Sequence, residues 1–390
     1  MRVVITHALR TPIGAFLGSL KQFSAVELGV HAVSALLDQA GLARERVDQL
    51  IFGNGRQAGG GTNPARQILI GSGIPESRSA MTINKACGSG LESIIQAVRL
   101  IRGGEAEIVV AGGTESMTRV PFELDLREGL RLGHATLHDG NFRDGFTCPL
   151  TRQPMGLTAE TLAERYDISR REQDEYAVGS QQKAEAARKA GRFDAEIAPI
   201  TVTDRKGQET VVSRDEHPRD GSTVEKLAKL PPVFKRDGTV HAGNSSGITD
   251  GAACVLVMSE DKAAELGFTE MAGIDGWTDA GVDPHVMGIG PVPAVRRYLE
   301  RYDCRLSDFD LIELNEAFAA QVIACDRELD LPKDKLNVNG GAIALGHPIG
   351  MTGCRIVVTL LHEMLRRDAR RGLATLCISG GLGMAAGFSR

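Results

Sequence analysis

One pattern of sequence occurs twice along this chain, in the same order. VDQLIFGNGRQ resembles FDLIELNEAFA, INKACGSGLESII parallels VNGGAIALGHPIGMTGCRIVV, and AEIVVAGGTESM resembles ATLCISGGLGMA. The matched segments are 47–57 with 309–319, 83–95 with 338–358, and 106–117 with 374–385. Three matches in one order indicate an internal duplication. We therefore expect two related halves that face each other.

Within the first half, short apolar runs alternate with helical periodicity. Strands are predicted at 3–6, 49–52 and 107–111, and a helix at 90–101 has its apolar residues on one face. Ser24 and Glu27 match a capping box that opens a helix ending at Gly41. A helix can also start at Asn63 or Pro64. This alternation favours an α/β fold with a mainly parallel sheet.

Past Pro121 the sequence becomes polar and rich in Arg, Asp and Gly. We interpret residues 120–245 as an insertion rather than another sheet, with one long helix from Ser169 to Ala190. After it the first pattern returns, with a strand at 253–258 and a helix at 292–301. The expected helix that follows the second glycine-rich loop begins near Thr352.

Bulk properties exclude several classes of protein. With 42% hydrophobic and 24% charged residues, the chain matches an ordinary globular average. No apolar run approaches the ~18 residues of a membrane span, and no secretory signal opens the chain, so we expect a cytoplasmic protein. The seven cysteines lack metal-ligand spacing. A net charge of −5 gives no general attraction to nucleic acid.

Three candidate reactive side chains lie in glycine-rich segments. Cys87 precedes a predicted helix, whose N-terminal N–H groups favour a thiolate. His347 can accept a thiol proton and later return it, because its reference pKa is about 6.5. Cys377 ends an apolar strand, where open α/β sheets place ligands. The competing interpretations are a buried structural cysteine, a turn histidine and a core strand cysteine. Two cysteines with one histidine suggest covalent acyl chemistry.

Other polar residues allow two interpretations each. Asn315 follows a strand, so its amide either caps the next helix or holds a water or an oxyanion. The remaining histidines, including His217 and His241, show no clear partner and are interpreted as structural or exposed. Five basic residues cluster in the insertion and form either a solvated face or a phosphate-binding patch. They are Arg219, Lys226, Lys229, Lys235 and Arg236.

These segments together resemble the thiolase family, over essentially the whole chain. NKACGSGLESI is similar to its nucleophile segment, NEAFAAQ to its asparagine segment, NVNGGAIALGHPIGMTG to its histidine segment, and CISGGLGMA to its second-cysteine segment. The resemblance implies a five-layered α/β/α/β/α fold of two duplicated halves with an inserted loop domain. The implied N-terminal half is 1–119 with 246–266, the coenzyme A-binding loop domain is 120–245, and the C-terminal half is 267–390.

The resemblance also implies catalytic roles. Cys87 would be acylated, His347 would take its proton, and Cys377 would exchange a proton with the α-carbon of the second acyl-CoA. One oxyanion site would use His347 and a water held by Asn315. The other would use the backbone N–H groups of Cys87 and Ser379.

Seven further residues are implied as coenzyme A or substrate contacts. They are Met155 near the acyl pocket, Phe234 against the adenine or pantetheine, Ser246 on the pantetheine, Arg219 at the adenosine end, and Met287, Ala317 and Phe318 along the tunnel. Two positions depart from the family pattern. Ser379 stands where many relatives have glycine, and would be strained if its φ were positive. Pro154 stands where many acetyl-specific relatives carry histidine.

The resemblance predicts an acyl-CoA C-acyltransferase that works through an acyl-cysteine, foremost an acetyl-CoA C-acetyltransferase. The alternatives are a broader-chain 3-ketoacyl-CoA thiolase of fatty-acid degradation and a non-catalytic acyl-CoA- or lipid-binding relative. A decarboxylating ketoacyl synthase is disfavoured, because that class generally pairs its cysteine with two histidines. We expect no metal and no cofactor beyond coenzyme A as substrate or product, no nucleic-acid or membrane partner, and a homo-oligomer, either dimer or tetramer.

Overall fold

The computed structural model describes all residues, 1–390. The strands are β1 (Val3–Arg10), β2 (Gly14–Ala15), β3 (Gln49–Gly53), β4 (Ser79–Ile83), β5 (Ile108–Ser116), β6 (Phe122–Glu123), β7 (His138–Asp139), β8 (Ile200–Thr203), β9 (Glu209–Val212), β10 (Thr249–Ser259), β11 (Ala272–Gly281), β12 (Leu311–Leu314), β13 (Arg371–Ile378) and β14 (Leu382–Ser389). The α-helices are α1 (Ala25–Ala40), α2 (Pro64–Gly71), α3 (Ser89–Arg102), α4 (Met155–Arg165), α5 (Arg170–Lys189), α6 (Val224–Leu227), α7 (Glu260–Leu266), α8 (Pro291–Arg301), α9 (Ala319–Leu329), α10 (Ala342–Leu345) and α11 (Ile349–Arg367).

The two repeats build the same strand arrangement. In the first half β3 pairs parallel with β5, which pairs antiparallel with β10. In the second half β12 pairs parallel with β13, which pairs antiparallel with β14. Each set continues to one more antiparallel neighbour, β1 beside β10 and β11 beside β14. The predicted duplication is therefore confirmed by the topology.

The prediction of a mainly parallel sheet is wrong. Parallel pairing within the large sheet joins only β3 with β4, β3 with β5, and β12 with β13. The short turn between β13 and β14 shows the reason, because a connection of that length closes a hairpin and cannot cross over to a parallel neighbour. The two halves meet edge to edge where β1 pairs with β11 over two residue pairs, Val4 with Gly273 and Ile5 with Ala272.

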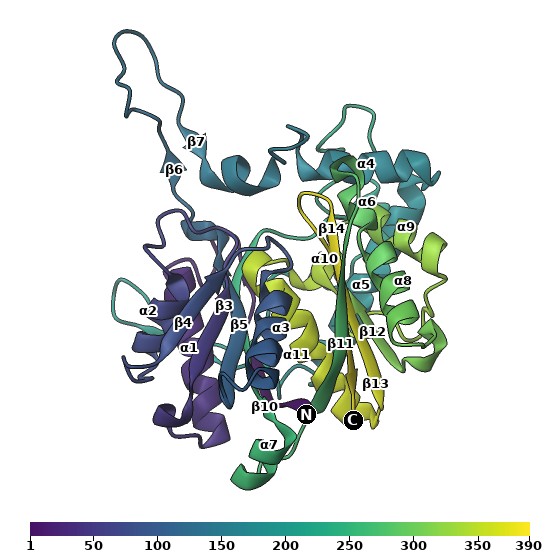
Figure 1. Cartoon of the computed structure of the whole chain (residues 1–390). Coiled ribbons are helices and arrows are strands. Elements are labelled where there is room, and N and C mark those ends of the chain that lie inside the picture. The colour runs from purple at the N-terminus through teal and green to yellow at the C-terminus, as the bar shows by residue number, and fades with distance from the viewer.

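The five layers of the predicted fold are present, and three apolar cores lie between them. One core packs α1 and α2 on the outer face of the first-half strands, and another packs α8 and α9 on the outer face of the second-half strands. The largest core holds α3 and α11 between the two sets of strands. Figure 1 shows α3 and α11 in this central position, flanked by the strands of both halves.

The central helices approach each other through glycine. A Cβ atom on Gly90 of α3 would lie 2.6 Å from the backbone nitrogen of Cys354 in α11, closer than side-chain atoms pack. Because α11 lies between the two sets of strands, its residues from Ile349 to Leu361 are all buried. This helix begins at Ile349, earlier than the predicted start near Thr352.

At the surface, the predicted capping box of Ser24 and Glu27 is present at α1.

The insertion, residues 120–245, contributes no strand to the large sheet. It holds α4, α5, α6 and two small two-stranded ribbons, β6–β7 and β8–β9. The predicted long helix is α5, capped by Ser169, whereas α4 was not predicted. A buried ion pair ties the insertion to β1, because Arg10 bonds Glu196 at 2.6 Å and Asp215 at 2.7 Å. In Figure 1 the segment that carries β6 and β7 extends away from the body as an arm. No helix of the chain combines the length and apolar character that crossing a membrane requires.

Candidate active site

Cys87 stands on a sharp turn between β4 and α3. The residue before it, Ala86, has φ of +46°, a left-handed conformation that costs a non-glycine residue roughly 1–2 kcal/mol. Two polar bonds hold the turn, from Lys85 N to Ser89 Oγ at 2.9 Å and from Ala86 N to Asn84 Oδ1 at 3.0 Å. The strained turn brings the partly buried thiol to the start of α3.

The second half approaches this turn closely. A Cβ atom on Gly88 would lie 2.6 Å from Ile378 Cδ1 and 2.9 Å from Met384 Sδ, so glycine allows the end of β13 to reach Cys87. Burial raises the pKa of the Cys87 thiol and outweighs the lowering effects of the Ser379 backbone N–H, the Arg56 charge and the backbone N–H of Cys87 itself. The expected resting thiolate is therefore not supported.

Ser379 fits its turn without backbone strain. The left-handed positions between β13 and β14 belong to Gly380, with φ of +89°, and Gly381, with φ of +86°. Ser379 itself has no positive φ. The substitution of serine for the glycine of many relatives therefore leaves the backbone N–H in place.

His347 lies between α10 and α11 and is only 8% exposed. Its Nδ1 lies 2.6 Å from Thr352 Oγ1, and the Thr352 hydroxyl donates to the Pro348 carbonyl at 2.9 Å. A hydroxyl has one proton, so Thr352 must accept at His347, and Nδ1 carries the hydrogen. Nε2 is then left as a free base. Burial, followed by the charges of Arg355 and Arg56, lowers the pKa of His347 to about 3.

Cys377 lies one residue before the end of β13 and is 1% exposed. It lines the same cavity as Cys87. Burial first, and then the neighbouring Cys87, raise the pKa of its thiol well above the ordinary value. Both cysteines are therefore protonated thiols in the ligand-free protein, and each needs a base or a substrate to release its proton.

Asn315 does not cap the helix after it. That helix, α9, begins at Ala319 with Phe318 at its N-cap, so the capping interpretation is wrong. The Asn315 side chain is fully buried, yet neither its Nδ2 nor its Oδ1 has a hydrogen-bond partner in the protein. Buried amides are normally satisfied, so an unpaired one indicates a site for a ligand or a water. The neighbouring Glu316 has a different role and accepts bonds from Tyr176, Ser180, Asn337 and Ile343.

A cavity of about 750 Å³ brings the candidate residues together. Its wall includes Cys87, His347, Cys377 and Ser379, but not Asn315, whose side chain is fully buried. The wall also contains every implied coenzyme or substrate contact, namely Met155, Arg219, Phe234, Ser246, Met287, Ala317 and Phe318. The volume suits a long and largely apolar ligand.

The apolar part of this wall is packed in advance. Phe234 and Phe318 stand edge to face, with ring centroids 6.2 Å apart. A Cβ atom on Gly156 would lie 2.2 Å from the Phe234 ring, so α4 fixes that ring from behind. Ser246 is held through its backbone N–H, which donates to the Ala317 carbonyl at 3.0 Å.

Sequence reasoning missed three residues of the cavity region. Thr352 orients His347, and Arg56 lines the cavity from the loop after β3. His217 also lines it and bonds the Ala344 carbonyl at 2.8 Å through Nδ1, a partner that the sequence did not reveal. His241 is buried and bonds Asp174 at 2.7 Å, which agrees with its interpretation as a structural histidine. For Thr352, its position five residues after His347 in the same loop-to-helix segment was the available signal.

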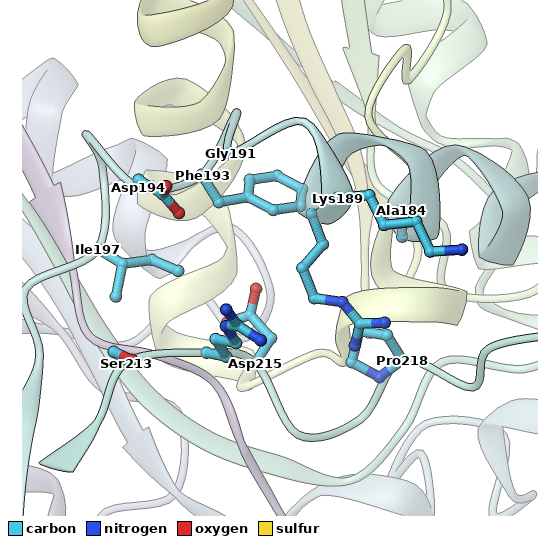
Figure 2. A pocket seen from close by; sticks show the side chains of 11 residues that line it. Ala184, Lys189, Gly191, Phe193, Asp194, Ile197, Ser213, Asp215 and Pro218 are labelled. Carbon is cyan, nitrogen blue, oxygen red and sulfur yellow. The ribbon is translucent and has the colours of Figure 1, made fainter.

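Of the predicted basic cluster, only Arg219 reaches the cavity wall. Lys235 pairs with Glu164 and Lys226 bonds the Gly221 carbonyl, both at the surface. A second pocket, of about 170 Å³, lies beside the end of α5 near Phe193 and Asp215 (Figure 2). It contains none of the predicted site residues. No group of three or more His, Cys, Asp and Glu side chains is placed to hold a metal ion.

Comparison with known proteins identifies the family. Residues 3–261 match the model of the thiolase N-terminal domain, and residues 268–390 match that of the thiolase C-terminal domain. The chain belongs to the thiolase family. The acetyl-CoA acetyltransferase of Pseudomonas aeruginosa is 53% identical, and the alignment covers 100% of this chain and 99% of that protein. A probable acetyl-CoA acyltransferase of Staphylococcus aureus is 51% identical over the same shares of the two chains.

Solved thiolase structures share the whole fold. The acetyl-CoA acetyltransferase of Bacillus anthracis superposes with a TM-score of 0.97 at 46% identity, over 100% of this chain and 98% of that one. Human mitochondrial 3-ketoacyl-CoA thiolase in complex with CoA gives a TM-score of 0.95 at 45% identity, over the same shares. The thiolase fold predicted from the motifs is thus confirmed, and the cavity can be considered as that of an enzyme.

Proposed function

We propose that this thiolase is an acyl-CoA C-acyltransferase, foremost an acetyl-CoA C-acetyltransferase, that forms or cleaves a 3-ketoacyl-CoA through an acyl group on Cys87. One observation carries the proposal. Cys87, His347 and Cys377 line a single cavity of about 750 Å³, although they come from both halves of the chain. The relatives named as acetyl-CoA acetyltransferases support the choice of acetyl-CoA as a substrate.

In the first step, His347 Nε2 takes the Cys87 proton while the sulfur attacks the thioester carbonyl of acetyl-CoA. The Sγ–C bond forms, the C–S bond to coenzyme A breaks, and the imidazolium returns its proton to the leaving thiolate. Because burial raises the pKa of the thiol and lowers that of the imidazole, proton transfer and attack must occur together. The free Nε2 set by Thr352 is the form this step needs.

In the second step, the Cys377 thiol gives its proton to His347 Nε2, and the resulting thiolate removes a proton from the α-carbon of a second acetyl-CoA. The carbanion attacks the acetyl carbonyl on Cys87 and a C–C bond forms; the bond from that carbon to the Cys87 sulfur breaks, and the Cys87 thiolate takes the proton held by His347. The backbone N–H groups of Cys87 and Ser379, both of which lower the pKa of the Cys87 thiol, are suited to the oxyanion of the acyl-enzyme. The unpaired amide of Asn315 is suited to a water that, with His347, stabilises the enolate oxygen.

This scheme uses only groups of the chain and coenzyme A, so we propose that no metal or prosthetic group takes part. The seven cavity contacts named above would hold coenzyme A and the acyl chain, with Arg219 toward the nucleotide. A broader-chain 3-ketoacyl-CoA thiolase is the second candidate. It is favoured by Pro154, which lines the cavity where acetyl-specific relatives carry histidine, and by the size of the cavity.

A mass-spectrometric experiment tests the chemistry. Acetyl-CoA should add one acetyl group to Cys87, and coenzyme A should then cleave 3-ketoacyl-CoA substrates from four carbons upward. Cys377→Ala should retain acetylation while it loses condensation, because it removes only the second-step base. An absence of both acetylation and thiolysis would sink the proposal, and equal loss of the two steps in Cys377→Ala would contradict the assigned roles.

We also propose a homo-oligomer, a tetramer in which the arm joins pairs of subunits. The arm carries exposed apolar side chains, among them Leu130, Leu132 and Leu137, and Leu132 is 94% exposed. Such a cluster is unusual on a surface that faces only water. The edge strand β4, which leads to Cys87, offers a second contact because it has a partner on one side only.

A further inference from the structure

The guanidinium of Arg56 lies at the cavity and makes no hydrogen bond to the protein. It lies in the loop after β3 and is only 8% exposed, so its side chain is more than nine-tenths buried. Its Nε atom is fully buried and has no hydrogen-bond partner. The only bond that Arg56 makes to a side chain is through its backbone nitrogen, to Glu115 Oε1 at 3.1 Å. The side chain lines the same cavity as Cys87 and His347.

The surroundings hold the guanidinium in place without accepting a hydrogen bond from it, although the pKa of the nearby Glu115, which burial raises, is lowered by the guanidinium charge. A Cβ atom on Gly145 would lie 1.6 Å from Arg56 Nη2, so the guanidinium packs against glycine backbone. The Phe146 ring lies 5.9 Å from Cζ and covers it further. Glu115 is the nearby acid, yet its two oxygens already accept bonds from Asn54 Nδ2 and from the N–H groups of Gly55, Arg56 and Gly350.

An arginine stays protonated at any working pH, and leaving its buried N–H donors without an acceptor is costly. A site that keeps such donors is suited to an anion that arrives with the ligand. The planar fork of N–H donors matches the two oxygens of a carboxylate or phosphate.

The position of Arg56 determines which part of the ligand it can meet. Its backbone N–H and that of Gly350, three residues after His347, donate to the same Glu115 carboxylate, and its side chain lines the cavity wall that also holds Cys87 and His347. Its charge also lowers the pKa of both Cys87 and His347. The phosphates of coenzyme A are separated from the thioester by the whole pantetheine arm. An anion beside Cys87 must therefore belong to the acyl chain. The anionic group that an acyl chain can carry at its end is a carboxylate.

We propose that Arg56 forms an acyl-end subsite that selects 3-ketoacyl-CoA substrates whose acyl chain ends in a carboxylate. This subsite rests on the proposed function and specifies the substrate class of that same site. In thiolysis, Cys87 bonds to the C3 carbonyl, the C2–C3 bond breaks, and its electron pair takes the Cys377 proton to give acetyl-CoA. Coenzyme A then takes the carboxyacyl group, and the protons released by the Cys87 and coenzyme A thiols restore both cysteines.

A pair of substrates of equal length tests the selection. The kcat/KM for thiolysis is measured with 3-ketoadipyl-CoA and with 3-ketohexanoyl-CoA, which differ only in the terminal carboxylate. The native enzyme should favour the carboxylate by about tenfold or more, the range of a charge-assisted hydrogen bond. Arg56→Met also changes the reactivity of Cys87, but this shared effect cancels in the ratio between the two substrates.

The ratio should fall to about one or below in Arg56→Met and be partly kept in Arg56→Lys. Arg205→Met, which removes an exposed arginine in the β8–β9 turn, is the matched control and should leave the ratio unchanged. A native ratio near one, or a ratio that Arg56→Met leaves unaltered, overturns the subsite.

A binding measurement separates this proposal from the proposed reaction. In Cys87→Ala enzyme, which cannot be acylated, adipyl-CoA should bind about tenfold more tightly than hexanoyl-CoA by calorimetry. Adding Arg56→Met should abolish the difference. If the preference is present but no substrate is turned over, the subsite stands and the proposed reaction fails. Turnover of 3-ketohexanoyl-CoA with no binding preference refutes the subsite alone.

Discussion

The tautomer of His347 depends on one hydroxyl. Thr352 donates its single proton to the Pro348 carbonyl, which leaves an oxygen lone pair for the His347 Nδ1–H. The arrangement is local, because Thr352 and Pro348 both belong to the first turn of α11 and its N-cap. The helix that supports the histidine therefore also sets which of its nitrogens acts as base.

Thr352→Val should slow acetylation of Cys87 by about 10–100-fold, part of the factor that a positioned general base supplies. Valine keeps the shape but offers no acceptor, so Nδ1–H is unpaired and the other tautomer becomes accessible. Thr352→Ser should retain most of the rate because it keeps the hydroxyl. The measurement is the rate of acetyl transfer to Cys87 at saturating acetyl-CoA. A valine variant as fast as the native enzyme would show that the bond has no role in the chemistry.

At the scale of elements, Glu316 joins the insertion to the second half. Its carboxylate accepts bonds from Tyr176 at 2.9 Å and Ser180 at 2.6 Å, both on α5, and from Asn337 and Ile343 of the second half. The side chain is 1% exposed. One buried carboxylate thus fixes α5 against the segment that leads to His347.

Glu316→Ala should lower the free energy of unfolding by about 3 kcal/mol, because it leaves several buried donors without an acceptor. Glu175→Ala is the matched control, since Glu175 pairs with Arg171 only at the surface of α5 and should cost less than about 0.5 kcal/mol. Urea unfolding midpoints compare the two variants. Equal shifts would show that Glu316 is no stronger a link than a surface ion pair.

Elements with local signals were predictable from the sequence, and elements with long-range causes were not. The capping box at Ser24 marked α1 correctly, because the bonds that start a helix lie within four residues, and the helical pattern from Ser169 marked α5. The antiparallel strands were missed because pairing direction depends on connections that periodicity does not record.

The candidate site shows the same division. Cys87, His347 and Cys377 were found from their glycine-rich segments, and the cavity brings them together. Arg56 was missed because an arginine in a polar loop has no unusual local pattern. The role proposed for Arg56 depends on its burial against Gly145 and Phe146, which lie about ninety residues further along the chain.

At the scale of the whole molecule, the arm is the feature least explained by the fold of one subunit. It leaves the body between β6 and β7 (Figure 1). Its leucines, among them Leu130, Leu132 and Leu137, are exposed to solvent. The large sheet and its three apolar cores do not include it. The arm can therefore be shortened without disturbing the central layers.

Replacing residues 124–137 by a short Gly-Ser turn should halve the assembly, from tetramer to dimer, with little change in the unfolding midpoint. The reason is that exposed leucines are removed from a proposed contact between subunits while no apolar core is opened. Light scattering after size-exclusion chromatography gives the mass. As a control, the single change Leu382→Ser removes an exposed leucine outside the arm and should leave the mass unaltered. An unchanged mass for the shortened chain would rule out this contact.

The edge at which β1 pairs with β11 joins the two halves, and this determines how the reactive groups come together. Cys87 belongs to one repeat, whereas His347 and Cys377 belong to the other, so neither copy alone holds both the nucleophile and the groups that move protons. In symmetry terms the chain is a covalently tethered dimer. The linking chain fixes the effective concentration of one half near the other. The pairing of nucleophile with base therefore does not weaken on dilution, as it would between two separate half-size polypeptides.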